Sequence, residues 1–245
     1  MFHPDGPSFL ELTQQALSST TRGYDLLATK FDYTPFRTPD ELLAPMMEII
    51  GPPKSLTRAL DVCCGTGAVA RQLRSRATEN VTGIDLSEGM LEEARRRWDA
   101  QMDEDDGVEG IFLQQDVLEM SFDSDFDVIT CCGAFGHILE PQQDAFAEAI
   151  HRALVPGGKF VFITHLMPTV GTVPWLAARG FNAVMHVRNA ILKPPFIMFY
   201  LTFPLERASD LLGRHGFQLE VHSPYANKQY GRKMRVVTAT RKKSG

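Results

Sequence analysis

The sequence predicts an α/β fold in which helices cover both faces of a seven-stranded, mostly parallel sheet. Three observations indicate this fold. Short apolar stretches typical of buried strands alternate with amphipathic stretches of helical length from residue 58 to residue 166. A glycine turn follows the first of these strands, in "DVCCGTG", and two strand-like segments, "GFQLEVHS" and "MRVVTATR", come at the end. Such alternation is typical of parallel sheets whose crossovers are helical.

Residues 1–57 are expected to form an N-terminal helical arm. Apolar residues recur at helical spacing over 8–32, and the turn-rich "YTPFRTP" of 33–39 interrupts that pattern. A second helix is predicted over 39–50, where "GPP" ends it, because proline cannot continue a helix.

Residues 58–166 are expected to form the core of the domain. The predicted order is strand 58–63, helix 67–76, strand 81–85, helix 87–99, an acidic loop 101–109, strand 110–115, strand 126–132, helix 142–153 and a fifth strand ending at 165. Residues 204–245 should complete the same domain, with a helix over 204–215 and the two closing strands.

The segment 167–203 breaks the alternation. It contains four prolines and is rich in Met, Phe and Trp. An insertion of this length in a regular sheet is typically a lid or a binding element. We therefore predict a lid or a binding element here, with ordinary packing as the alternative.

Composition places the chain among ordinary globular proteins. Of its 245 residues, 44% are hydrophobic and 22% are charged, which suits one large domain. The net charge of −5 is unevenly distributed: residues 1–148 carry −16 and residues 149–245 carry +11, with no Asp or Glu between Glu148 and Glu206. This asymmetry indicates either two complementary faces of one fold or a site that prefers an anionic substrate.

The cysteines and the N-terminus bear on location. Four cysteines in two adjacent pairs do not resemble the disulfide framework of a secreted protein. No basic-then-apolar leader is evident, and no apolar run reaches the roughly 18 residues of a membrane span. We expect a reduced, cytoplasmic protein.

The stretch "RALDVCCGTGAVARQL" (58–73) predicts a ligand site. Gly65 and Gly67 allow a sharp turn and a close approach of the backbone to a ligand. "GTGAVA" also fits the dinucleotide pattern, with Asp85 about 20 residues further on. Two ligands are consistent with it, a dinucleotide or another adenosine compound, and Asp85 would accept from ribose hydroxyls in both. A helix N-cap beside Ser87 is the structural alternative for Asp85.

Two further acids distinguish these ligands. Asp61 lies inside the first strand, where it suits a ligand that carries an ammonium group rather than a pyrophosphate. Asp116 ends the third strand in "QQDV". It could accept from an adenine amino group while the amide of Val117 donates to the ring.

These residues resemble the class I S-adenosylmethionine-dependent methyltransferases. The resemblance covers roughly 58–166 and rests on "LDVCCGTG", "VTGIDLSEGMLEEAR", "QQDV", "FDVITCCGAFGHI" and "LVPGGKFV", in the family's order. Cys63 replaces the first glycine of the family's acid-x-Gly-x-Gly-x-Gly motif. The form "DVCCGTG" is similar to that of the quinone-biosynthesis branch.

The resemblance implies a Rossmann-like three-layer sandwich, S-adenosylmethionine as cofactor and S-adenosylhomocysteine as product. The implied cofactor-binding residues in the core are Asp61, Cys63, Gly65, Gly67, Asp85, Leu86, Met90, Asp116, Val117 and Cys131. The N-terminal arm of such enzymes often closes over the cofactor, which makes Tyr24, Tyr33 and Arg37 candidates as well.

The methyl acceptor is predicted in coarser terms. The apolar and basic insertion suits a small or mid-sized, partly apolar and anionic acceptor, with Arg179, His186, Arg188, Phe199 and Tyr200 as candidate contacts. His165 and His137 are candidate general bases. The alternatives are a non-catalytic binding or regulatory protein of the same fold and, more remotely, a dinucleotide-dependent oxidoreductase.

No metal is expected, because the adjacent cysteines lack the C-x-x-C spacing that lets two thiolates reach one ion. A four-cysteine metal site and thiol-dependent arsenite methylation are minor alternatives to simple packing. No nucleic-acid substrate is expected, because "CCGAFG" stands where DNA and RNA methyltransferases carry an Asn/Asp-Pro-Pro-Tyr/Phe-type motif. No membrane contact is expected either, although docking of the insertion on an anionic membrane is a lesser alternative. The chain should be a monomer or a homodimer.

Overall fold

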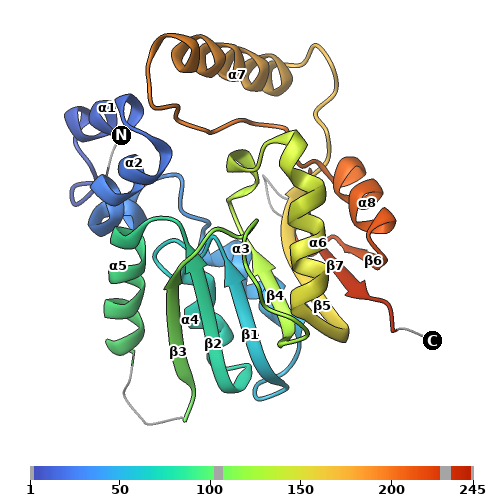
Figure 1. Cartoon of the computed structure of the whole chain (residues 1–245). Helices are drawn as coiled ribbons and strands as arrows, with labels where there is room; N and C mark the ends of the chain where they lie inside the picture. Colours follow the sequence, from blue (N-terminus) through green and yellow to red (C-terminus); the bar gives the residue numbers. More distant parts are fainter. Residues whose placement is uncertain (1–2, 102–106, 227–232, 244–245) are drawn as a thin grey trace.

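The computed structural model describes residues 3–101, 107–226 and 233–243. Its seven-stranded sheet has the order β3-β2-β1-β4-β5-β7-β6 (Figure 1). Strand β7 alone runs antiparallel to its neighbours. The strands are β1 (Leu56–Val62), β2 (Ala77–Asp85), β3 (Glu109–Gln114), β4 (Phe126–Cys131), β5 (Leu154–His165), β6 (Phe217–His222) and β7 (Met234–Arg241). The predicted α/β fold is confirmed.

Helices cover both faces of the sheet (Figure 1). On one face lie α3 (Asp40–Ile50), α4 (Ala68–Leu73) and α5 (Glu88–Asp99), and on the other lie α6 (Gln143–Ala153) and α8 (Leu205–Arg214). Side chains of a strand alternate between the two faces. Accordingly, Leu60 packs in the core below α6 and α8, while its neighbour Ala59 packs in the core below α3, α4 and α5.

The strand order locates the site. Strand β1 lies between β2 and β4, so the connections leaving its two sides go to opposite faces of the sheet. Ligands of open parallel sheets bind at such a point, at the carboxyl ends of the strands. Asp61 is in register with Gly83 of β2 and Thr130 of β4 at this point.

The N-terminal arm consists of α1 (Phe9–Leu17), α2 (Thr20–Leu27) and the 3-10 helix η1 (Ala28–Tyr33). A capping box of Ser8 and Glu11 starts α1, and the hydroxyl of Ser19 caps α2. These caps divide the helical stretch predicted over 8–32 into separate helices. The arm lies beside α5, over the carboxyl ends of the strands (Figure 1).

Two carboxylates hold the arm in place. Asp25 accepts from the Ser87 hydroxyl (2.5 Å) and from the Gly89 amide (3.1 Å) at the start of α5. Asp32 accepts from the Thr66 hydroxyl (2.6 Å) and from the Arg97 guanidinium. Arg37 and Arg71 lie 3.3 and 3.9 Å from the same Asp32 carboxylate.

The segment 167–203 contains a long helix, α7 (Val173–Ile191), that the sequence analysis did not predict. It stands apart from the sheet, above the carboxyl ends of the strands (Figure 1). Pro174 occupies its first turn, where the missing amide costs nothing. None of the helices in the described residues combines the length and apolarity needed to cross a membrane.

Other elements differ from the prediction by a few residues. Helix α4 ends at Leu73, and β2 begins at Ala77, four residues before the strand predicted over 81–85. The first part of that strand, "ATEN", has no apolar alternation to reveal it. Most of the predicted acidic loop, 102–106, lies outside the described residues.

Candidate functional site

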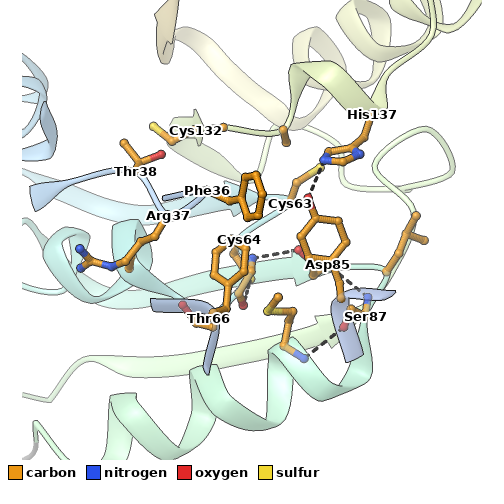
Figure 2. Close-up of a pocket in the computed structure, with 18 of the residues that line it drawn as sticks. Phe36, Arg37, Thr38, Cys63, Cys64, Thr66, Asp85, Ser87, Cys132 and His137 are labelled. Carbon is orange, nitrogen blue, oxygen red and sulfur yellow. Dashed lines mark hydrogen bonds between the residues drawn. The ribbon is translucent and has the colours of Figure 1, made fainter. Parts of the chain in front are cut away.

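A cavity of about 340 Å³ lies at the carboxyl ends of β1 and β2, beneath the arm. Figure 2 shows Cys63, Cys64 and Asp85 on its sheet side, with Phe36 and Arg37 reaching it from the arm. Its volume falls in the range of roughly 300–1,000 Å³ that is usual for small-molecule sites.

The glycine turn forms one wall of the cavity. Cys63 has φ +54°, Gly65 has φ +53° and Gly67 has φ +73°, a left-handed conformation that favours glycine. A glycine would therefore relieve strain at Cys63, the position where the family's motif has one. A Cβ on Gly65 would meet nothing within 4 Å, so this residue leaves open space for a ligand.

Gly67 has a different role from the one predicted. It does not line the cavity. A Cβ at this position would lie 3.1 Å from the Cβ of Ala94, so Gly67 permits α4 to pack closely against α5.

Asp85 ends β2 with its carboxylate at the cavity. One oxygen accepts from the Gly65 amide (2.8 Å) and the other from the Ser87 amide (2.9 Å). Each oxygen keeps a lone pair for a further donor. Burial raises the pKa of Asp85 above its ordinary value. The hydrogen bonds from the amides lower the pKa, but their effect is smaller. The N-cap alternative is wrong for Asp85, since the hydroxyl of Ser87 caps α5 by accepting from Met90.

Asp61 is a buried acid with an unused oxygen. Its Oδ1 accepts from the Thr130 hydroxyl (2.8 Å), whereas Oδ2 has no hydrogen-bond partner among the described residues. Burial raises the pKa of Asp61 to about 7. A buried carboxylate without a partner is costly, so an ammonium group of a ligand would compensate it.

The arm contributes Tyr24 and Arg37 to the cavity, as predicted, but not Tyr33. Tyr33 is half-exposed and stacks on His3, with ring centroids 4.7 Å apart. Arg37 pairs with Asp40 at 2.7 Å as well as with Asp32.

His137 follows β4 in η2 (Phe135–His137) and lines the cavity. Its Nδ1 contacts the carbonyl of Ile197, and its Nε2 lies 2.9 Å from the hydroxyl of Tyr24. A carbonyl can only accept, so Nδ1 carries the proton and Nε2 accepts from Tyr24. Burial lowers the pKa of His137 and raises the pKa of Tyr24.

Besides Gly67 and Tyr33, three predicted cofactor residues lie outside the cavity lining: Asp116, Val117 and Cys131. Asp116 accepts from the Leu118 amide (2.9 Å), and Val117 packs in the core. Cys131 faces the same core and contacts Cys63, so the ends of the neighbouring strands β1 and β4 bring one cysteine of each pair together. All four thiols are free, and Cys132 lines the cavity in place of Cys131.

A second, outer cavity of about 1,180 Å³ lies between α7, α8 and the segment 199–202. Of the predicted acceptor residues, Arg179, His186, Phe199 and Tyr200 line it. Tyr200 also lines the inner cavity, so the two cavities share one wall.

Arg188 and His165 do not fit their predicted roles. Arg188 donates to the carbonyls of Ala16 (3.0 Å), Ser18 (2.8 Å) and Pro194 (2.8 Å), which ties α7 to the arm. His165 ends β5, with Nδ1 3.1 Å from the Leu166 carbonyl, and lines neither cavity.

Sequence reasoning missed several lining residues. They come from the arm and from the chain after α7: Thr20, Thr21, Phe31, Pro35, Phe36, Thr38 and Met198. None of them belongs to a motif, and they reach the cavity only because distant segments fold back over it. Leu86 and Met90, both predicted, do line it.

The sheet order, the glycine turn and the acid at the end of β2 define an α/β domain with its ligand cavity at the carboxyl edge of the sheet. Residues 59–158 match the model of a methyltransferase domain family. A 134-residue stretch, 54% of this chain, is 36% identical to demethylmenaquinone methyltransferase of Staphylococcus aureus (strain JH9). It covers 52% of that protein, so the match spans about half the length of this relative.

Solved structures show the same fold. Phosphoethanolamine N-methyltransferase 2 of Haemonchus contortus, in complex with phosphomonomethylethanolamine and S-adenosylhomocysteine, superposes with a TM-score of 0.63 at 21% identity, over 99% of this chain and 62% of that one. Magnesium protoporphyrin IX methyltransferase of Synechocystis PCC 6803, with bound S-adenosylhomocysteine, superposes with a TM-score of 0.59 at 16% identity. The match covers 94% of this chain and 99% of that one. The match to the methyltransferase domain family covers residues 59–158, and these structures share the fold of nearly the whole chain.

Proposed function

We propose that this protein transfers a methyl group from S-adenosylmethionine to a small or mid-sized, partly apolar and anionic acceptor. The observation that carries the proposal is the inner cavity, where an unpartnered buried oxygen of Asp61, the open turn at Gly65 and the carboxylate of Asp85 lie together. The cofactor, when bound, supplies a methyl group already activated on a sulfonium sulfur. The protein has to bind the cofactor and the acceptor, orient them for transfer, and exclude water from the site.

The inner cavity fits this cofactor in its donor set. Asp85 offers carboxylate lone pairs for ribose hydroxyls, and Asp61 offers a carboxylate oxygen for the ammonium group. Arg37, at the arm side of the cavity, would bind the cofactor's carboxylate, although it already pairs with Asp32 and Asp40. Gly65 leaves room for the ligand beside its backbone.

The arm closes this cavity from above. Tyr24, Phe31 and Phe36 cover it with aromatic rings, and the carboxylates of Asp25 and Asp32 anchor the arm to α5 and α4. An apolar cover of this kind keeps water from the reacting groups. It also implies that the arm opens to admit the cofactor and to release the product.

The outer cavity would receive the acceptor. Arg179 lies over the ring of Trp175, 5.7 Å from its centroid, and makes no ion pair within the described part of the chain. Its guanidinium is thus available for an anionic group. His186 and Phe199 stack with ring centroids 4.6 Å apart and offer an aromatic surface to an apolar moiety.

Tyr24 and His137 form a pair that could remove a proton from the acceptor. Neutral His137 presents Nε2 to the Tyr24 hydroxyl, so Tyr24 can pass its proton to Nε2 while its oxygen takes a proton from the acceptor. This pair replaces His165 as the candidate base.

The test is calorimetry followed by a transfer assay. We expect S-adenosylhomocysteine to bind in a one-to-one ratio and NADH not to bind. Methyl transfer is then measured by mass spectrometry with a panel of aromatic and aliphatic acceptors with and without a carboxylate or phenolate. Binding of NADH in preference would overturn the proposal. Binding of S-adenosylhomocysteine without transfer to any acceptor would favour a non-catalytic member of the fold.

A further inference from the structure

The outward face of α7 is apolar and uncovered. Val173, Leu176, Val184, Val187 and Ile191 recur at the spacing of one helical face and are 55–78% exposed. We call these five residues the α7 stripe. A soluble helix ordinarily turns its apolar face inward, whereas no residue of α7 is buried in the described structure.

The opposite face of α7 is fixed by polar bonds. Asn182 exchanges two hydrogen bonds with the backbone of Tyr200 (2.9 and 2.8 Å), and Asn189 exchanges two with the backbone of Phe196 (3.0 and 2.9 Å). Arg188 adds its bonds to the arm. The α7 stripe therefore points outward because the polar residues of the helix are committed inward.

The charged residues within α7 and the adjoining sequence have one sign. No Asp or Glu occurs between Glu148 and Glu206, while Arg179 and Lys193 are exposed at α7 and just after it. Leu17 at the end of α1 is 57% exposed and extends the apolar surface, because Arg188 bonds to the carbonyls of its two neighbours. Helix α7 and the residues just after it therefore combine exposed apolar side chains with cations and contain no carboxylate, whereas Glu140, Asp144, Glu206 and Asp210 line the outer cavity.

We propose that α7 docks on an anionic lipid bilayer, with the α7 stripe in the interface and Arg179 and Lys193 at the headgroups. Apolar contact together with basic side chains is the usual combination for interfacial helices. A second copy of this chain fits less well, because a twofold contact through the α7 stripe would bring like charges together. Arg179 and His186 also border the outer cavity, so docking would bring its rim to the lipid surface. The proposal takes up the lesser alternative of the sequence analysis, docking of the insertion on an anionic membrane.

The experiment is co-sedimentation of the full chain with vesicles of phosphatidylcholine alone or with phosphatidylglycerol. We expect binding to the anionic vesicles that weakens with added salt and little binding to phosphatidylcholine. The double variant Val184→Asp/Val187→Asp should bind at least about tenfold more weakly, because it places carboxylates where the surface meets acyl chains. Lys193→Gln should reduce binding less and flatten the salt dependence.

Val221→Asp on β6, 45% exposed and far from α7 in the sequence, is the matched control and should bind as the wild type does. Circular dichroism and S-adenosylhomocysteine binding check that each variant folds. Absence of binding to anionic vesicles at low salt, or equal binding by the double variant, would overturn the proposal. So would a stable dimer that only the double variant disrupts. These outcomes do not depend on methyl transfer, so they leave the proposed function to its own test.

Discussion

The Tyr24 hydroxyl lies 2.9 Å from His137 Nε2, which joins the N-terminal arm to the segment after β4 across 113 residues of sequence. This bond closes the arm over the inner cavity and aligns the only two side chains that we place in a proton transfer. It thus couples closure of the site to its proposed chemistry.

The first prediction tests this pair. Tyr24→Phe keeps the ring over the cavity but removes the hydroxyl, so kcat should fall by about 10²-fold or more if a proton must leave the acceptor. S-adenosylhomocysteine affinity should change by no more than a few-fold. Tyr33→Phe, outside the cavity, is the matched control and should leave kcat unchanged. An unchanged kcat in Tyr24→Phe would assign the tyrosine to closure alone.

The second prediction concerns pH and Asp61. An ammonium ligand needs the carboxylate, whereas a pKa of about 7 leaves Asp61 protonated below neutrality in the ligand-free protein. S-adenosylhomocysteine affinity should therefore fall by up to about tenfold per pH unit below pH 7. Calorimetry from pH 5.5 to 8.5 checks this. Asp61→Asn should bind weakly and without that pH dependence.

Asp61 also has a consequence for stability. Its pKa is raised in the folded protein, so the folded state holds a proton that the unfolded state has released between about pH 4 and 7. The contribution of Asp61 to the free energy of unfolding must decrease as the pH rises through this interval. Asp61→Asn should accordingly stabilise the ligand-free protein by roughly 1–3 kcal/mol at pH 8. A less stable variant in urea unfolding at pH 8 would contradict this.

The third prediction concerns Asp85. Asp85→Ala removes the acceptor for ribose hydroxyls and the partner of the Gly65 and Ser87 amides. Charge-assisted bonds contribute on the order of 1.5–3 kcal/mol each, so S-adenosylhomocysteine affinity should fall at least about tenfold. Asp85→Asn keeps one acceptor oxygen, so its affinity for S-adenosylhomocysteine should fall less than that of Asp85→Ala. Equal affinity of wild type and Asp85→Ala by calorimetry would refute the assignment.

The fourth prediction concerns the anchor of the arm. Asp32→Asn removes the charge that Arg37, Arg71 and Arg97 share, so the arm should open more often. Stopped-flow fluorescence should show faster release of S-adenosylhomocysteine, and limited proteolysis should cut the arm earlier. Asp40→Asn is the control, because its exposed pair with Arg37 contributes little. Identical release rates for both variants would remove Asp32 from this role.

The fifth prediction separates two arginines of α7. Arg179→Ala should raise the Michaelis constant for an anionic acceptor and leave S-adenosylhomocysteine affinity unchanged. Arg188→Ala breaks the bonds to Ala16 and Ser18, so it should make α7 and the arm more sensitive to protease. If Arg188→Ala instead raised the Michaelis constant for the acceptor without changing protease sensitivity, Arg188 would belong to the acceptor site.

The sequence by itself determined the sheet and the local features of the cofactor site. Buried strands and amphipathic helices leave a periodic pattern, and the turn at Gly65 needs residues that tolerate positive φ. For this reason the strands and the positions of Asp61 and Asp85 followed from sequence. Both residues belong to the strands whose order brings them together, so local pattern and tertiary contact agree.

Only the tertiary structure decided what covers the site. Tyr24 and Phe36 reach the cavity because the arm folds back over the strand ends, and no local pattern records that approach. The helix α7 escaped prediction because the prolines on either side of it, and Pro174 in its first turn, made the whole segment look irregular, whereas proline is tolerated in a first turn. The bonds of Arg188 to the carbonyls of Ala16 and Ser18 placed it in the scaffold rather than in the site. Contacts with residues far apart in the sequence, rather than local secondary-structure propensity, determined where the arm and α7 lie.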